Sequence, residues 1–340
     1  MVRKYLKVEV AVALVLGLVA GLAIWSTVKP LVPHRPFYPF IATQVRIDIP
    51  VASYPASSSA PRVSSRTIRS VPVLSYHQMN NGGTDSVTQQ QFYDQMNWLH
   101  SRGYHTITMP EYVQWAAGHQ VMLPRKPVLL TVDDGIANFY EYATPVLRHF
   151  GYNAVSMIVS GFATRAQNYE RKYWGWDATW TQLQNLPPAT WSFAFHAGWQ
   201  GHLLSKTGCV YFYPCQRPHE SAAAYHARVT RDIQTGRETE KRMLGKRMDT
   251  QVWAVPFNDL AQAPSEPQSG SAPGRWLDSM ATRAFRVVFV DGLTTRNNQH
   301  YRYEVHGGDS LNYFARQMQR SGVFLQHPAN TAQAREGGWS

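Results

Sequence analysis

Cysteine is scarce in this chain, which has only two among 340 residues. Two thiols exclude a multi-disulfide scaffold and a zinc site built from cysteines. Regular spacing is absent as well: 23 glycines and 21 prolines follow no period, which excludes collagen-like and repeat architectures. Because 44% of the residues are hydrophobic and 16% charged, the chain can form one sizeable globular domain or two small ones.

Acidic residues are few relative to basic ones. The 33 lysines and arginines against 22 aspartates and glutamates give a formal net charge of +11. Such a surplus is typical of contact with anionic surfaces, such as lipid head groups or cell-wall polymers. The basic residues are scattered rather than clustered, so no nucleic-acid partner is expected. The 13 histidines, 18 tyrosines and 11 tryptophans favour a carbohydrate site or a metal site.

A long apolar run occupies the amino terminus. It extends over residues 8–28, is interrupted only by Glu9, and follows three basic residues, Arg3, Lys4 and Lys7. About 20 helical residues cross a hydrocarbon core, and a basic flank upstream keeps the start of the chain in the cytoplasm. We therefore expect residues 1–28 to be a membrane anchor, with the rest outside the cell. The alternative is a signal peptide cleaved near Ala20 or Ala23, after which the protein is secreted.

The next segment, residues 29–70, is rich in proline and serine. Proline without periodicity favours an extended chain that does not pack, so this segment is predicted to be a linker. The globular domain is expected to comprise residues 71–340.

Alternating apolar runs and helical patterns fill this domain. Alternation at this pitch is typical of an α/β barrel-like fold. The predicted strands are 71–76, 127–132, 154–159, 191–195, 252–255 and 285–290, and the predicted helices are 92–102, 111–118, 138–150 and 221–244.

Polar residues follow three of these strands, where an α/β barrel builds its site. Asp133 and Asp134 end the second predicted strand, His196 ends the fourth and precedes His202 by six positions, and His77 ends the first. One carboxylate and two imidazoles form a common ligand set for Zn²⁺ or a similar ion, which leaves the second carboxylate as a base and His77 as a proton donor. Each element also has an ordinary interpretation, an Asp-Asp-Gly turn or a surface histidine.

Two segments make the pattern specific. Val71-Pro-Val-Leu-Ser-Tyr-His77 and Thr131-Val-Asp-Asp-Gly135 resemble the signature of polysaccharide deacetylases, the NodB-like carbohydrate esterase family 4. The resemblance covers residues 71–245, with weaker similarity to about residue 305. It is strongest to the branch that deacetylates poly-N-acetylglucosamine in biofilms.

This resemblance implies an incomplete (β/α) barrel that removes acetyl groups with the help of a divalent ion, Zn²⁺ first and Co²⁺, Ni²⁺ or Fe²⁺ as alternatives. It implies Asp134, His196 and His202 as metal ligands, Asp133 as general base and His77 as catalytic acid. A backbone N–H near Phe257 would stabilise the oxyanion. It further implies a sugar site lined by Pro256, Phe257 and Asn258, with Trp199 or Trp253 beside them.

The chain departs from the family pattern at three points. Ala197 stands where Ser or Thr is usual, Asn258 replaces a glycine, and the spacing between His196 and His202 is one residue longer than the usual four or five. His219 is the next candidate ligand if His202 does not bind. A disulfide between Cys209 and Cys215 is predicted, because the domain is expected to be exported. It would hold a tyrosine-rich loop beside the strand that ends at His196, and the tyrosine rings of this loop are suited to stacking on sugars.

The expected function is therefore metal-dependent deacetylation of extracellular poly-N-acetylglucosamine. Peptidoglycan and chitin oligomers are alternative substrates within the enzyme class. A membrane-tethered glycan-binding protein without catalysis is the alternative from another class, because Ala197 and the longer histidine spacing could reflect a lost activity.

Overall fold

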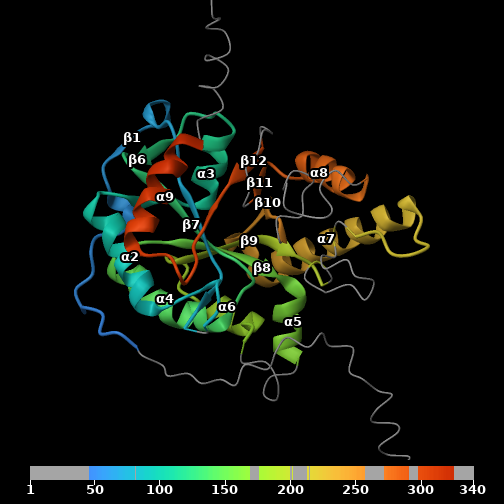
Figure 1. Cartoon of the computed structure of the whole chain (residues 1–340), viewed down its shortest axis with the longest axis horizontal. Helices are drawn as coiled ribbons and strands as arrows, with labels where there is room; N and C mark the ends of the chain where they lie inside the picture. The colour runs from blue at the N-terminus through green and yellow to red at the C-terminus, as the bar shows by residue number, and fades with distance from the viewer. Residues whose placement is uncertain are drawn as a thin grey trace, which may run out of the picture. The chain divides into compact units, whose positions relative to one another are not determined.

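The computed structural model describes residues 46–80, 82–168, 176–199, 201, 213, 215–256, 272–290 and 298–324. Figure 1 shows their helices and strands, coloured by position along the chain. Among these residues, no helix is both long and apolar enough to cross a membrane. The apolar run 8–28 lies outside them, so the membrane anchor stays a prediction.

Strands and helices alternate along much of the described chain, as the sequence predicts. The strands are β1 (Arg62–Ser64), β2 (Val73–Tyr76), β3 (Gln78–Met79), β4 (Ser86–Val87), β5 (His105–Thr106), β6 (Met122–Pro124), β7 (Pro127–Val132), β8 (Ala154–Val159), β9 (Trp191–Ala197), β10 (Met248–Ala254), β11 (Val287–Val290), β12 (Gln299–Tyr301) and β13 (Tyr303–Glu304). The helices are α2 (Gln89–Ser101), α3 (Met109–Ala116), α4 (Ala137–His149), α5 (Ser160–Asn168), α6 (Trp180–Asn185), α7 (Ala222–Leu244), α8 (Ala272–Ala284) and α9 (Leu311–Phe324). Consecutive strands occur at β2–β4, β6–β7 and β11–β13, and consecutive helices at α5–α6.

The main sheet is parallel and curls until its two ends nearly meet. Its strand order is β12-β11-β10-β9-β8-β7-β2-β13, with β5 paired to β7. The first and last strands of this path are consecutive in the chain and are separated only by Arg302. The Arg302 amide donates to the Val290 carbonyl on one side of the seam, and the Val305 amide donates to the Ser75 carbonyl on the other. The predicted incomplete (β/α) barrel is thus confirmed as a nearly closed parallel sheet with helices around it (Figure 1).

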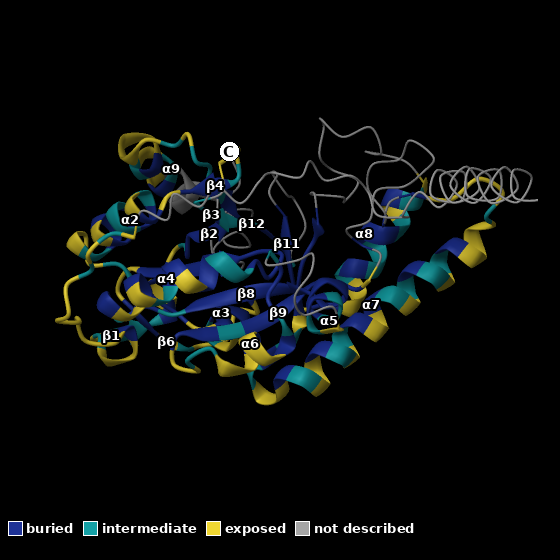
Figure 2. Cartoon of the chain, turned by 90° about the horizontal axis from the view of Figure 1, so that it is seen from below, coloured by how far each residue is buried: buried dark blue, intermediate teal, exposed yellow. Residues whose placement is uncertain are grey.

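Strand alternation divides the core into two layers, because successive side chains of a strand point to opposite faces. In β7, Val128, Leu130 and Val132 pack with residues of the surrounding helices, in what we call the helix-side core. Leu129 instead packs with residues of the other strand faces and of α3, in what we call the interior core. The central strands β2, β7 and β8 are buried throughout, and α7 buries one face only (Figure 2).

Residues 54–68 differ from the expected linker. The amides of Tyr54 and Ser57 donate to the carbonyls of His149 and Gly151, and β1 pairs with β6 in an antiparallel ladder. Ser57 and Ile68 are buried. These residues dock through backbone hydrogen bonds and small hydroxyls rather than through an apolar period, so sequence periodicity does not reveal the contact.

Candidate active site

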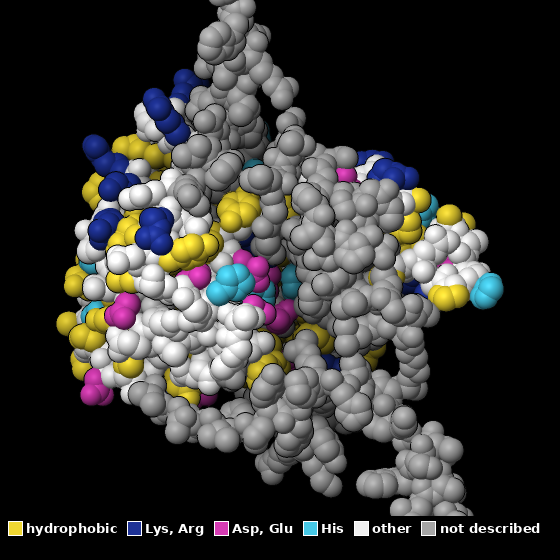
Figure 3. Space-filling model, viewed as in Figure 1, with side chains coloured by type: hydrophobic (Ala, Val, Ile, Leu, Met, Phe, Trp, Pro, Cys, Tyr) yellow, Lys and Arg dark blue, Asp and Glu magenta, His cyan; other side chains and the backbone are white. Residues whose placement is uncertain are grey.

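Strand alternation brings three of the predicted site residues to the interior side of the barrel. His77, Asp133 and His196 each follow, by an even number of positions, a strand residue of the interior core, namely Val73, Leu129 and Ala194. All three stand at the carboxyl ends of parallel strands, which meet at one edge. Acidic and histidine side chains gather on this face of the molecule (Figure 3).

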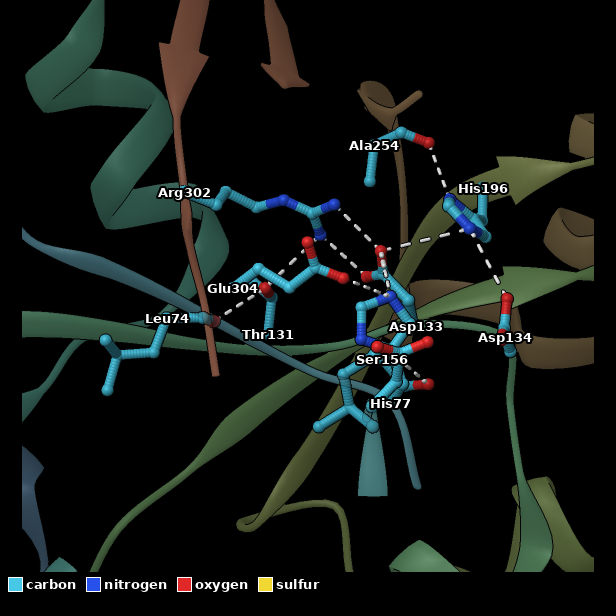
Figure 4. Close-up of polar contacts among 12 residues, drawn as sticks. Leu74, His77, Thr131, Asp133, Asp134, Ser156, His196, Ala254, Arg302 and Glu304 are labelled. Carbon is cyan, nitrogen blue, oxygen red and sulfur yellow. Dashed lines mark hydrogen bonds and ion pairs between the residues drawn. The ribbon is translucent and has the colours of Figure 1, made fainter. Parts of the chain in front are cut away.

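Asp133 is held by a buried arginine. Arg302 Nη1 and Nη2 lie 2.6 and 2.8 Å from the two carboxylate oxygens of Asp133, a bidentate pair. Both side chains are almost completely buried. Figure 4 shows Asp133 between Arg302, at the seam of the sheet, and His196, on β9. The Asp133 carboxylate is therefore fixed in orientation before any substrate enters.

The charge state of Asp133 follows from its neighbours. Burial by itself would raise its pKa, but the Arg302 guanidinium, His196 and His77 together hold the pKa of Asp133 below its usual value. The carboxylate is thus ionised at neutral pH and available as a proton acceptor.

Asp134 lies in a strained turn that redirects its side chain. Its φ is +71° and that of the following Gly135 is +82°, both in the left-handed region. Aspartate tolerates this region better than most residues, and such strain is concentrated at functional sites. The turn brings Asp134 Oδ1 to 3.5 Å from Nε2 of His196.

His196 is oriented by backbone groups. Its Nδ1 lies 2.7 Å from the Ala254 carbonyl, which can only accept, so Nδ1 donates and Nε2 is the nitrogen directed toward the site. The indole nitrogen of Trp253 donates to the His196 carbonyl at 2.8 Å. The bond at Nδ1 therefore orients the ring of His196, and the Trp253 bond fixes its backbone.

The pair formed by Asp134 and His196 fits a first-row divalent ion. Two ligand atoms each about 2.1 Å from an ion, and separated by a tetrahedral angle, lie about 3.4 Å apart. The observed separation between Asp134 Oδ1 and His196 Nε2 is 3.5 Å. The third predicted ligand, His202, lies outside the described residues, and the fallback candidate His219 is exposed just before α7.

His77 faces the site from β2. Its Nε2 lies 3.8 Å from Oδ2 of Asp133 and 3.8 Å from Oε1 of Glu304. Its side chain is 16% exposed, so the ring reaches both the interior and solvent. This placement suits a proton donor, because a reacting group entering from outside can meet the ring.

A second group of ligand-type side chains lies at the rim. Within the described part of the chain, Asp85, Glu304 and His306 have ligand atoms within 4.8 Å of one another. His306 lies 3.4 Å from Asp85 and 4.0 Å from Glu304, so ion pairs account for the grouping.

The predicted sugar-binding residues separate into different environments. Trp199 is 46% exposed on the loop after β9, as a stacking platform requires. Trp253, in contrast, is fully buried in the helix-side core, with its ring 5.7 Å from Tyr213. Trp253 therefore does not line the groove, because strand alternation directs it away from the face that His196 uses. Pro256 is buried after β10, and Phe257 and Asn258 lie outside the described residues.

The tyrosine-rich loop also differs from expectation at its one described tyrosine. Cys215 is disulfide-bonded, while Cys209 lies outside the described residues, so their pairing stays a prediction. Tyr213 is fully buried and cannot stack on a sugar. The side chain of Tyr213 packs in the helix-side core instead.

Sequence reasoning missed two residues of the site, Arg302 and Glu304. They lie 169 and 171 positions after Asp133, Arg302 between the short strands β12 and β13 and Glu304 in β13, and neither strand has a long apolar run. The available signal was weak: an arginine between two brief β-prone segments. Only the closure of the sheet places Arg302 against Asp133.

No family model matches the chain. A Bacillus subtilis protein named putative polysaccharide deacetylase YxkH is 34% identical over 93 residues, which is 26% of this chain and 32% of that protein. The poly-beta-1,6-N-acetyl-D-glucosamine N-deacetylase of Escherichia coli K12 is 26% identical over 179 residues, 47% of this chain and 26% of that protein. The matches thus span about a third or less of these two relatives.

Among solved structures, a de-N-acetylase from Aggregatibacter actinomycetemcomitans superposes with a TM-score of 0.57 at 18% identity, covering 72% of this chain and 98% of that one. At this identity the likeness supports the fold alone. The sequence and structure comparisons together confirm the predicted resemblance to polysaccharide deacetylases. Within that class, the relatives include proteins named for poly-β-1,6-N-acetylglucosamine.

Proposed function

We propose that the protein is a polysaccharide N-deacetylase that hydrolyses the acetamido groups of poly-N-acetylglucosamine with the help of a divalent ion, Zn²⁺ in the first instance. One observation carries the proposal: Asp133 lies between a bidentate arginine and a histidine whose Nε2 is 3.5 Å from a second carboxylate. A base and two metal-type ligands are thereby separate but adjacent, as amide hydrolysis requires.

The residues divide the chemistry as follows. Asp134 and His196 hold the ion, which when bound supplies a Lewis acid for the acetyl carbonyl and for water. Asp133, ionised and fixed by Arg302, accepts the proton of the attacking water. His77, whose Nε2 lies 3.8 Å from Oδ2 of Asp133, donates a proton to the departing amine. Glu304, 3.8 Å from His77 Nε2, stabilises the protonated form of that ring.

The substrate class rests on the relatives and on the exposed aromatic at the rim. Two of the named relatives act, by their names, on poly-β-1,6-N-acetylglucosamine or on polysaccharides. Trp199 offers a flat apolar face beside the metal strand, and sugar rings stack on such faces. We propose that the catalytic domain acts outside the cell, since the basic flank and apolar run 8–28 support an amino-terminal anchor.

The test is amine release by the purified full-length chain from β-1,6-linked N-acetylglucosamine oligomers. We expect activity with Zn²⁺ or Co²⁺, loss of activity with a chelator, and recovery when the ion is restored. Activity only on chitin or peptidoglycan oligomers would change the substrate but keep the reaction. Glycan binding without amine release, with or without a metal ion, would overturn the proposal in favour of a binding protein.

A further inference from the structure

The chain that leaves His196 is packed unusually close to its surroundings. At Gly201, a Cβ would lie 2.6 Å from the Tyr213 ring, and at Gly198 it would meet the Asp232 backbone on α7. Gly236, one turn further along α7, would place a Cβ 2.8 Å from the Gly198 Cα. Real Cβ atoms are not found at such distances, so these glycines permit a contact that other residues would prevent.

Two side chains bind the free amides of this segment. The Gly198 N–H donates to the Tyr213 hydroxyl at 3.0 Å, and the Trp199 N–H donates to Oδ1 of Asp232 at 3.0 Å. The Tyr213 hydroxyl in turn donates to Oδ2 of Asp232 at 3.0 Å. We call Tyr213 and Asp232 the loop clamp. It satisfies the amides that β9 leaves without a ladder partner where the strand ends.

The clamp is itself anchored in the helix layer. Tyr213 is fully buried, its ring lies edge-on to Trp253 with centroids 5.7 Å apart, and its carbonyl accepts from the Tyr225 hydroxyl at 2.5 Å. Asp232 and Tyr225 both belong to α7. A rigid helix thus fixes a segment that would otherwise be a glycine-rich loop.

We propose that Tyr213 and Asp232 are positioning residues for the metal site. They hold Gly198, Trp199 and Gly201 against α7 and the Tyr213 ring, so that the chain directly after His196 keeps one position. This inference rests on the proposed function, because it assigns the loop to the metal-binding strand. Its physical basis is entropy: the clamp removes conformational freedom from the chain next to His196 before the ion binds.

The experiment measures Zn²⁺ affinity of the full-length chain by competition with a chromogenic chelator. In Tyr213→Phe the ring packing remains and only the hydroxyl is lost, and we expect about 10- to 100-fold weaker Zn²⁺ binding. Asp232→Asn keeps one acceptor for the Trp199 amide and should give a smaller loss. The matched control is Tyr152→Phe, which removes another buried hydroxyl, bonded to the Tyr104 carbonyl at 2.8 Å, and should leave Zn²⁺ affinity unchanged.

The outcomes separate this inference from the proposed function. Unchanged Zn²⁺ affinity in both clamp variants, with a melting temperature lowered as in Tyr152→Phe, would reduce the clamp to a packing feature and overturn the inference. If the clamp variants bind Zn²⁺ more weakly but the wild-type chain releases no amine, the clamp is supported and the deacetylase is rejected. A wild-type chain that binds no Zn²⁺ would overturn both. If Tyr213→Phe does not fold, Asp232→Asn decides.

Discussion

The two sides of the site are held by different forces. On the carboxylate side, Asp133 is paired with the guanidinium of Arg302, from a strand far along the chain. On the histidine side, His196 is oriented by the carbonyl of Ala254 and by the indole of Trp253, both from neighbouring β10. The carboxylate of Asp133 is therefore held by a buried charge pair. The ring of His196 is held by a neutral hydrogen bond at Nδ1, while its Nε2 faces the carboxylates of Asp133 and Asp134.

This difference matches what each side has to do. A base must stay ionised, and the charge of Arg302 keeps the Asp133 carboxylate in that form despite burial. A metal ligand must present a lone pair, and the carbonyl acceptor on Nδ1 makes Nε2 the nitrogen of His196 that faces the ligand position.

The largest expected effect comes from removing the charge of the base. Asp133→Asn keeps the side-chain shape, so it should lower kcat/KM by about 100- to 10,000-fold, the range that general base catalysis contributes. Bound Zn²⁺ should remain near the wild-type level, because Asp134 and His196 are retained. Amine release and metal analysis of the same preparation check both statements. Loss of Zn²⁺ in Asp133→Asn would show that Asp133 is itself a ligand.

Removing the other half of the charge pair should affect stability most. Arg302→Met leaves the buried Asp133 carboxylate without its cation and should lower the free energy of unfolding by about 3–5 kcal/mol. Urea denaturation measures the change. The control is Arg46→Met: Arg46 pairs with Glu141 at the surface, with side chains 59% and 48% exposed, and its loss should cost less than about 1 kcal/mol. Equal losses in the two variants would contradict a special role for the buried pair.

The histidine side should respond more mildly. Trp253→Phe removes the indole N–H that the His196 carbonyl accepts, which should weaken Zn²⁺ binding several-fold and cost about 1–3 kcal/mol of stability. Trp191→Phe is the matched control. Trp191 lies at the amino end of β9, the strand that carries His196, and its indole donates to Thr144 instead. A similar stability loss with unchanged Zn²⁺ affinity is expected there. Equal changes of Zn²⁺ affinity in Trp253→Phe and Trp191→Phe would show that the bond from Trp253 to the His196 carbonyl has no specific effect on the metal site.

The smallest effect concerns a buried carboxyl group behind the histidine side. Glu240 on α7 is fully buried, and burial raises its pKa well above 4.5, with Arg237 opposing only part of the shift. The folded state therefore keeps Glu240 protonated, while the unfolded chain ionises it above about pH 4.5. Its contribution to stability is complete below that pH and is lost as the pH rises toward the folded-state pKa.

Glu240→Gln should remove this pH dependence. Between pH 5 and pH 8, as urea denaturation at both values would show, the free energy of unfolding should fall less in the variant than in the wild type. The control Glu238→Gln alters an exposed glutamate of the same helix and should follow the wild type. A variant with the wild-type pH dependence would exclude Glu240 as its source.

Local pattern predicted much of the barrel and of its catalytic edge. A continuous apolar run predicted the bounds of β7 as observed. The helical pattern after it predicted the bounds of α4 within one residue. The motif residues His77, Asp133, Asp134 and His196 were identified because polar groups directly after apolar strands are unusual. The resemblance implied Trp199 or Trp253 beside the sugar site, and strand alternation turns Trp253 to the helix-side core.

The sequence by itself thus determined six strands of the main sheet, the helices α2, α3, α4 and α7, and the residues that end the site strands, because these depend on spacing between near neighbours. Tertiary structure alone decided the rest. Arg302 reaches Asp133 only because the sheet closes on itself at that residue, and Tyr213 meets Gly198 and Asp232 only because α7 packs behind β9. Contacts between residues so far apart depend on how the strands and helices pack, and no local periodicity encodes that arrangement.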